Sequence, residues 1–259
     1  MKKSKIAVLV AMVVVLAFSL AACGGSDKSS SDKTVYKVGT EPTFPPFDTT
    51  DEDQNIVGLD MDLIKAIGED QDFDVEFENL SFDGLIPALK AGNIDIVAAG
   101  MNKDDEDRQK EVDFSDSYYE SKLFVAVTED NTTIKSVEDL TPDMKVAAQT
   151  GTTGASKVQE LKDAGKIKEA VILDGLDTCM MKLINGDVSA VINDKPVTEA
   201  YMKKQPDKIK MVGEALNAEN YGFAVQKGNA ELVEKINNGL KHIKENGTYD
   251  KLVDEWFNK

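Results

Sequence analysis

Histidine and cysteine are nearly absent from this sequence of 259 residues, which contains one histidine and two cysteines. A structural zinc site needs four Cys or His ligands, and a catalytic thiol needs a neighbouring base, so this scarcity argues against both. Cys179 stands beside Met180, Met181 and Leu183, which is typical of a small buried apolar residue. No glycine-rich phosphate loop is present either. The sequence therefore predicts no metal, no cofactor and no catalytic residue.

Arginine is just as rare, because Arg108 is the only one, against 29 lysines. Its planar guanidinium binds a carboxylate or phosphate through two hydrogen bonds at once, which a lysine ammonium does not. Arg108 follows an apolar, strand-forming run, residues 94–99, that stops at Gly100. Ligands of open α/β sheets lie beyond such strand ends, so Arg108 is a candidate partner for an anionic group of a ligand. The alternative is a surface arginine paired with one of the acidic residues 104–107.

Acidic residues outnumber basic ones and give a net charge of −17. A surface of this sign repels nucleic acid and favours solubility, so no nucleic-acid partner is expected. The global charge does not decide the charge of a ligand, because a binding site can carry the opposite sign locally. The length allows one or two domains with substantial cores.

The chain begins with a segment typical of export. Lys2, Lys3 and Lys5 precede an apolar run, Ile6–Leu20. The following residues, up to Cys23, resemble the lipobox of bacterial lipoproteins. This resemblance implies a signal peptide over residues 1–22, lipid on Cys23, and attachment to the outer face of the cytoplasmic membrane, as in Gram-positive bacteria. The alternative is an uncleaved anchor helix.

Residues 23–33 are rich in glycine, serine and charge, which predicts a flexible linker. With Cys23 lipidated, Cys179 has no partner for an intramolecular disulfide.

Beyond the linker, strand and helix patterns alternate in two blocks, which predicts an α/β fold with two lobes. In the first block we expect strands at 35–40, 75–80 and 94–99, and helices at 58–67 and 82–92. In the second we expect strands at 123–128, 145–149, 170–173 and 188–192, and helices at 150–164, at 176–185 and from 196. The tail predicts a strand at 221–226 and two helices, the first closed at 246–247 and the second carrying Trp256 and Phe257.

Three loops in this arrangement display groups suited to binding. Three prolines stiffen the loop carrying Phe44 and Phe47, so these rings form either a binding wall or part of the core. The turn 150–154, Thr-Gly-Thr-Thr-Gly, offers hydroxyl and backbone N–H groups to an anion, or is a plain helix N-cap. Asp194 ends a strand, and either binds a cation or caps the next helix.

The chain resembles the extracellular amino-acid-binding proteins of ABC importers over residues 35–258. The resemblance is carried by several motifs in combination: Gly58-Leu-Asp-Met-Asp-Leu, Phe82-Asp-Gly-Leu-Ile-Pro-Ala-Leu, Arg108 with the following Val-Asp-Phe-Ser-Asp-Ser-Tyr-Tyr, Gly151-Thr-Thr, Asn193-Asp194, Tyr221-Gly and Asn246-Gly-Thr-Tyr. It implies the type II periplasmic-binding-protein fold, two doubly wound α/β lobes joined by two crossing segments near 118–122 and 218–222. Lobe 1 would span 34–121 and 222–259, and lobe 2 would span 122–221.

The resemblance also implies roles for individual residues. Arg108 would bind the α-carboxylate of an amino acid, with help from the turn at Gly151, Thr152 and Thr153. Asp194, next to Asn193, would bind the α-ammonium. The remaining ligand-binding candidates supply a backbone carbonyl, an amide, aromatic walls and groups that read the ligand's side chain: Ala99, Gly100, Asn102, Phe44, Phe82, Glu41 and Gln149. Seven residues separate Gly100 from Arg108, one more than the family pattern, so we expect a bulged loop or a shifted Arg108.

The function implied is capture of a free L-amino acid, polar or basic such as arginine, lysine or glutamine, and its delivery to an ABC transporter permease by a monomeric binding protein. Two alternatives stay open. The chain could belong to an amino-acid-sensing receptor, or it could be an exported lyase of dehydratase type, although the sequence offers few acid/base groups for catalysis.

Overall fold

The computed structural model describes residues 33–258. The predicted signal peptide, the predicted lipidation site Cys23 and nearly all of the predicted linker lie outside these residues. Within the described range, no helix has both the length and the apolar character needed to span a bilayer.

Lobe 1 is built on a five-stranded sheet in which three parallel strands are joined by two strands from later in the chain. Its order is β4 (Phe73–Asn79), β1 (Thr34–Thr40), β5 (Ile96–Val97), β14 (Ala224–Gln226) and β6 (Val112–Phe114). β1 runs parallel to β4 and β5, whereas β14 runs antiparallel to β5 and β6. The sheet is therefore mixed, and the tail of the chain completes the lobe that the first residues begin.

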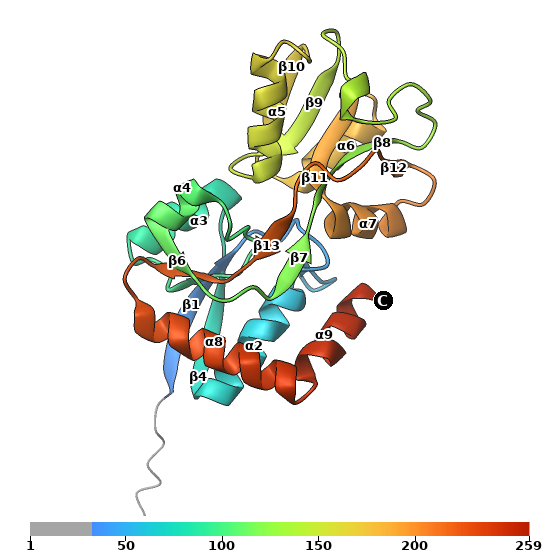
Figure 1. Ribbon diagram of the computed structural model, residues 1–259. Coiled ribbons are helices and arrows are strands. Elements are labelled where there is room, and N and C mark those ends of the chain that lie inside the picture. Colours follow the sequence, from blue (N-terminus) through green and yellow to red (C-terminus); the bar gives the residue numbers. More distant parts are fainter. Residues whose placement is uncertain (1–32, 259) are drawn as a thin grey trace, which may run out of the picture. The chain divides into compact units, whose positions relative to one another are not determined.

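Five helices belong to lobe 1: α2 (Leu59–Gln71), α3 (Phe82–Lys90), α4 (Glu106–Glu111), α8 (Ala230–Glu245) and α9 (Thr248–Phe257). The two C-terminal helices lie beside α2, as Figure 1 shows. Gly239 of α8 allows this close packing, because a Cβ there would lie 2.7 Å from the side chain of Ile67. A short hairpin, β2 (Thr49–Thr50) and β3 (Ile56–Val57), precedes α2.

Lobe 2 has its own five-stranded sheet, with one apolar cluster made only of its residues and other apolar residues that join the cluster of lobe 1. The order is β10 (Glu169–Leu173), β9 (Lys145–Gln149), β11 (Ala190–Asp194), β8 (Leu123–Thr128) and β12 (Ile209–Val212). β9, β10 and β11 are parallel, and β8 is antiparallel to β11 and β12. The helical elements of this lobe are η1 (Val137–Asp139), α5 (Thr153–Asp163), α6 (Leu176–Ile184) and α7 (Lys195–Lys204). Both predicted sheets are thus present.

Two short strands, β7 (Tyr119–Ser121) and β13 (Glu219–Tyr221), connect the lobes and pair with each other antiparallel. They lie side by side in Figure 1. The predicted strand 221–226 is therefore two strands, β13 and β14, interrupted at Gly222. A Cβ at Gly222 would lie 3.3 Å from the Ser115 carbonyl oxygen, so the chain turns there in tight contact with its neighbour.

Aromatic rings pack around the crossing strands. Phe47 is fully buried, and its ring contacts Tyr119, Tyr221 and Phe257 at centroid distances of 4.9, 5.0 and 5.7 Å. Phe47 is therefore a core residue, which is the second of the two alternatives that the sequence left open for the rings of its loop. Ring pairs of this kind stabilise the junction beyond the effect of their area.

Candidate functional site

Residues from both lobes line a small cavity with an empty volume of about 260 Å³. The lining residues are Phe44, Phe82, Gly100, Asn102, Arg108, Gln149, Thr152, Thr153, Asp194 and Glu219. Nine of them are candidates from the sequence. The candidates Glu41, Ala99 and Asn193 do not line the cavity, and Glu219 was not foreseen.

Arg108 is buried, with only 9% of its surface exposed. One guanidinium nitrogen, Nη1, donates to the Asn102 carbonyl at 3.2 Å, and Nη2 donates to the Gly151 carbonyl at 2.9 Å. The guanidinium also lies 5.4 Å from the ring centroid of Phe82. Burial lowers the pKa of Arg108 from its usual value. The guanidinium nevertheless keeps its positive charge, because arginine does not lose its proton in proteins.

In the described part of the chain, Arg108 does not form the alternative arrangement, a surface ion pair with one of the acidic residues 104–107. No ion pair joins Arg108 to an acidic side chain within residues 33–258. Asp105 instead caps α4, accepting hydrogen bonds from the backbone N–H groups of Asp107 and Arg108. Despite the extra residue between Gly100 and Arg108, the guanidinium reaches the cavity.

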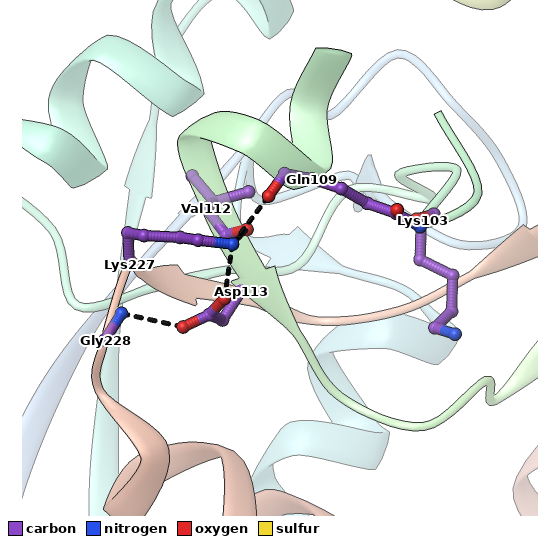
Figure 2. A network of polar contacts seen from close by, with 6 residues as sticks. All are labelled: Lys103, Gln109, Val112, Asp113, Lys227 and Gly228. Atoms are coloured by element: carbon purple, nitrogen blue, oxygen red, sulfur yellow. Dashed lines mark hydrogen bonds and ion pairs between the residues drawn. The ribbon is translucent and has the colours of Figure 1, made fainter. Parts of the chain in front are cut away.

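The C-terminal end of α4 is fixed by the side chain of Lys227, at the turn between β14 and α8. Its Nζ donates to the Gln109 carbonyl at 2.6 Å and forms an ion pair with Asp113 at 2.7 Å (Figure 2). Asp113 also accepts from the Gly228 N–H at 2.7 Å. A cation at the C-terminus of a helix stabilises the last carbonyls, so this network helps hold the six-residue helix that carries Arg108.

The turn before α5 belongs to lobe 2 and presents Thr152 and Thr153 to the cavity. Thr152 is a true N-cap: its Oγ1 accepts from the Ala155 N–H at 3.0 Å and donates to the Gln149 carbonyl at 2.7 Å. Gly151 adopts φ +73°, and a Cβ at this position would lie 3.0 Å from the side chain of Asp83. Only glycine fits this conformation and this close approach without strain.

Asp194 is at the N-cap position of α7, but its side chain makes no capping hydrogen bond. Oδ1 instead accepts from the hydroxyls of Ser121 at 2.9 Å and Tyr221 at 2.5 Å, both on the crossing strands. Burial, and then the nearby charge of Glu219, raise the pKa of Asp194 well above its usual range. The side chain therefore does not cap α7, and it lines the cavity instead.

Asn193, the neighbour of Asp194, does not line the cavity. Its Nδ2 donates to Thr198 Oγ1 and to the Asp194 carbonyl, both at 3.2 Å, so its side chain holds the start of α7.

Glu41 does not line the cavity, but its side chain contacts that of Gln149, which does. Gln149 Nε2 donates to Glu41 Oε2 at 2.7 Å, and the hydroxyl of Thr43 donates to the same oxygen at 2.7 Å. Burial raises the pKa of Glu41. Burial also raises the pKa of Cys179 to about 12, so this thiol is protonated and behaves as a small apolar residue.

Phe44 and Gly100 form a second wall. Gly100 adopts φ +54°, and a Cβ there would lie 2.7 Å from the Phe44 ring, so glycine allows the ring to close over the backbone. Ala99 packs in the core below.

Two carboxyl groups, Asp60 and Asp48, are buried near this wall, and Asp60 contacts Gly100. Asp60 Oδ2 accepts from the Gly100 N–H at 2.8 Å and from the Tyr118 hydroxyl at 2.7 Å. Its Oδ1 and Oδ1 of Asp48 are buried and have no hydrogen-bond partner in the described part of the chain. Burial raises the pKa of Asp60 to about 7, and burial followed by the charge of Asp60 raises the pKa of Asp48. Two such groups side by side favour retention of a proton.

This arrangement makes stability depend on pH in a defined direction. Between about pH 4, where an unfolded aspartate titrates, and about pH 7, folded Asp60 keeps a proton that the unfolded chain has lost. The stabilisation is complete below pH ~4 and is lost as the pH rises through about 7. We expect the thermal midpoint to fall more between pH 5 and pH 8 in the wild type than in Asp60→Asn, whose amide does not ionise.

The matched control is Asp74→Asn, at an exposed position of β4, which should keep the wild-type pH dependence. Equal pH dependence in the wild type and Asp60→Asn would contradict the buried proton.

Comparison with known proteins agrees with this geometry. The family of bacterial extracellular solute-binding proteins, family 3, matches residues 36–259. The chain belongs to this family. The solute-binding protein is 32% identical to the arginine-binding extracellular protein ArtP of Bacillus subtilis, with 96% of each chain covered. It is 33% identical to the L-cystine-binding protein TcyA of the same organism, covering 99% of this chain and 98% of TcyA.

Among solved structures, the solute-binding protein is similar to an ancestral arginine-binding protein bound to arginine, with 44% identity and a TM-score of 0.82, covering 87% of this chain and 99% of the other. This confirms the predicted fold, two sheet-containing lobes of the type II periplasmic-binding class.

Proposed function

We propose that this protein captures a free L-amino acid between its lobes and delivers it to an ABC transporter permease. The observation that carries the proposal is that a basic and an acidic residue from different lobes, Arg108 and Asp194, line one cavity. Arg108 of lobe 1 is placed to bind an α-carboxylate, and Asp194 of lobe 2 is placed to bind an α-ammonium. Relatives that bind arginine and cystine support the same class of ligand.

Contact with both lobes gives the ligand a way to drive closure. A ligand shifts an equilibrium between open and closed states only by its differential affinity for the two. Arg108 already donates to the Gly151 carbonyl across the lobes, and Tyr201 of α7 donates to the Thr43 carbonyl at 3.0 Å. An amino acid bound to Arg108 and Asp194 would add to these direct contacts.

We further propose a cationic side chain on the ligand, arginine foremost. Glu41, Asp194 and Glu219 place three carboxyl groups in or beside the cavity, against the one guanidinium of Arg108. A zwitterion adds no net charge, so a neutral ligand would leave an excess of buried negative charge, which is costly. A cationic group beside Glu41 reduces this excess.

The direct test of the function is a thermal-shift panel of the twenty amino acids with ornithine and citrulline. Specific binding at a ligand concentration a hundred times the dissociation constant adds about 2.7 kcal/mol to stability, which shifts the midpoint measurably. Stabilisation by basic amino acids is expected. A panel with no stabilising ligand would refute the proposal.

Glu41→Gln tests the choice of side chain. Since Gln149 already donates to Glu41, the amide of a glutamine can keep one hydrogen bond while the charge is removed. We expect the affinity for L-arginine, measured by calorimetry, to fall about tenfold or more, which is about 1.4 kcal/mol. The affinity for L-glutamine should change much less. An unchanged affinity for L-arginine would favour a neutral ligand.

The cellular setting follows from the same proposal. Lipid on Cys23 and the linker 23–33 would tether a monomer to the outer face of the membrane, with lobe 1 formed by 34–121 and 222–259 and lobe 2 by 122–221. We propose binding without catalysis, because the relatives that the chain resembles are arginine- and cystine-binding proteins. His242 is half-exposed on α8, where its Nδ1 lies 2.7 Å from Asp70.

A further inference from the structure

Glu219 brings a second carboxyl group to the Asp194 end of the cavity. It lies on β13, is only 2% exposed and is among the lining residues. Asn217 Nδ2 donates to its Oε1 at 2.9 Å. In the pairing of β13 with β7, Glu219 stands opposite Ser121, the residue that donates to Asp194. The crossing strands therefore fix both carboxyl groups at one place.

An α-ammonium has three N–H donors, and Asp194 alone does not satisfy them. Oδ1 of Asp194 already accepts two hydrogen bonds, from Ser121 and Tyr221, which leaves mainly Oδ2 for a ligand. Glu219 lines the same cavity and supplies further acceptor oxygens. A protonated amine thus fits between two carboxyl groups better than beside one.

Before a ligand binds, burying these two carboxyl groups together costs free energy. Two carboxylates buried together repel each other, and one of them retains a proton more readily than either would alone. Burial, and then the charge of Glu219, raise the pKa of Asp194, which is the direction expected for such a pair.

The charged surroundings of the pair come from several elements. Arg108 of α4 faces it across the cavity, and Tyr221 contacts it from β13. Glu219 also borders a second pocket on the outer side of the crossing strands, whose charged lining residues are Glu120, Lys122, Lys195 and Glu199. Arg108 favours ionised carboxylates, while their mutual repulsion and burial favour retention of one proton.

We propose that Asp194 and Glu219 together bind the α-ammonium of the ligand, and that a proton held by Asp194 beside Glu219 before binding is released when the ammonium binds. This inference rests on the proposed amino-acid function. A carboxyl O–H bond breaks and the proton passes to the buffer, while the ammonium keeps its three N–H bonds. Glu219 is in this view a specificity residue that selects a protonated amine.

The experiment is calorimetry with L-arginine at pH 6.5 in phosphate, PIPES and imidazole buffers, which differ in ionisation enthalpy. The slope of the observed binding enthalpy against that quantity gives the number of protons exchanged. We expect the wild type to release between about 0.5 and 1 proton, as a coupled acid pair that loses one proton would. Its affinity should also rise between pH 6 and pH 8, by up to about tenfold per pH unit.

In Glu219→Gln, Asp194 stays buried but loses the neighbouring charge that is the second cause of its raised pKa, so the release and the pH dependence should be smaller than in the wild type. Glu120→Gln is the matched control, because Glu120 lies on the paired strand β7 and is exposed, and this variant should behave like the wild type. The wild-type measurement needs no variant, so it decides even if Glu219→Gln folds poorly.

Binding of L-arginine without proton release would overturn the proton held by Asp194 and leave the proposed function standing. Unchanged release in Glu219→Gln would place the proton elsewhere and equally overturn the inference. A failure of L-arginine and all other amino acids to bind would instead refute the proposed function itself.

Discussion

Arg108→Lys is expected to weaken binding of L-arginine about 100-fold or more, or about 2.8 kcal/mol. The substitution keeps the positive charge but replaces a planar fork with a single ammonium. In the structure both Nη atoms are engaged, one with the Asn102 carbonyl and one with the Gly151 carbonyl of lobe 2. Lysine cannot hold both of these positions and grip an α-carboxylate. Isothermal calorimetry measures the change.

Lys110→Met is the matched control, because Lys110 lies on the same short helix but is exposed and pairs with Asp107 at 2.6 Å. Its affinity should stay within about twofold of the wild type, as expected for a surface pair. Wild-type affinity in Arg108→Lys would remove Arg108 from the binding site.

Asp194→Asn is expected to reduce affinity by a similar factor, about 100-fold or more. Asparagine keeps the shape and an oxygen that accepts from Ser121 and Tyr221, but it loses the charge and can turn an NH₂ group toward the ligand. A cation would then face a neutral amide at the point where it needs an anion. The dissociation constant for L-arginine, compared at one pH with the wild type, measures this loss.

Asp187→Asn, at an exposed position of lobe 2 near Lys182, should bind as the wild type does. N-acetyl-L-arginine, which lacks the ammonium, provides a second check. It should bind the wild type poorly and should lose little further affinity in Asp194→Asn. If Asp194→Asn bound L-arginine as tightly as the wild type, the ammonium would have to lie elsewhere.

Much of the fold could be predicted because local patterns and tertiary structure agree. The strands 123–128 and 145–149 have the predicted bounds, since each is a short apolar run that is also buried. The predicted strand 94–99 is assigned only at Ile96–Val97, although its apolar residues are buried. Its neighbour β14 pairs with those two residues alone, and the length of a neighbouring strand is not visible in a local pattern.

Most of the cavity could also be predicted, because Arg108, Thr152 and Asp194 follow strand ends, where α/β proteins bind ligands. Glu219 was missed because it lies in a segment that the sequence presents only as a connection. A signal was available: Glu219 and Tyr221 are two residues apart, so in a strand their side chains share one face. Only the pairing with β7 brings that face to Asp194.

Asp48 and Asp60 show a second limit. Aspartate is a residue type that is usually exposed, and no local pattern indicates that these two carboxyl groups are fully buried. Their burial follows from packing of the 44–48 loop against the start of α2.

Arg108 and Asp194 form one pair of residues, and Glu41 and Gln149 form another. This division has a consequence for how such proteins diversify. Under the proposed function, the first pair would bind atoms that every amino acid shares, and it is tied to a helix and a strand end. The second pair would contact the side chain, which differs between amino acids, and Glu41 follows the end of β1 in a loop. Selection could therefore exchange one nutrient for another by altering two positions, leaving the hinge and the common grip untouched.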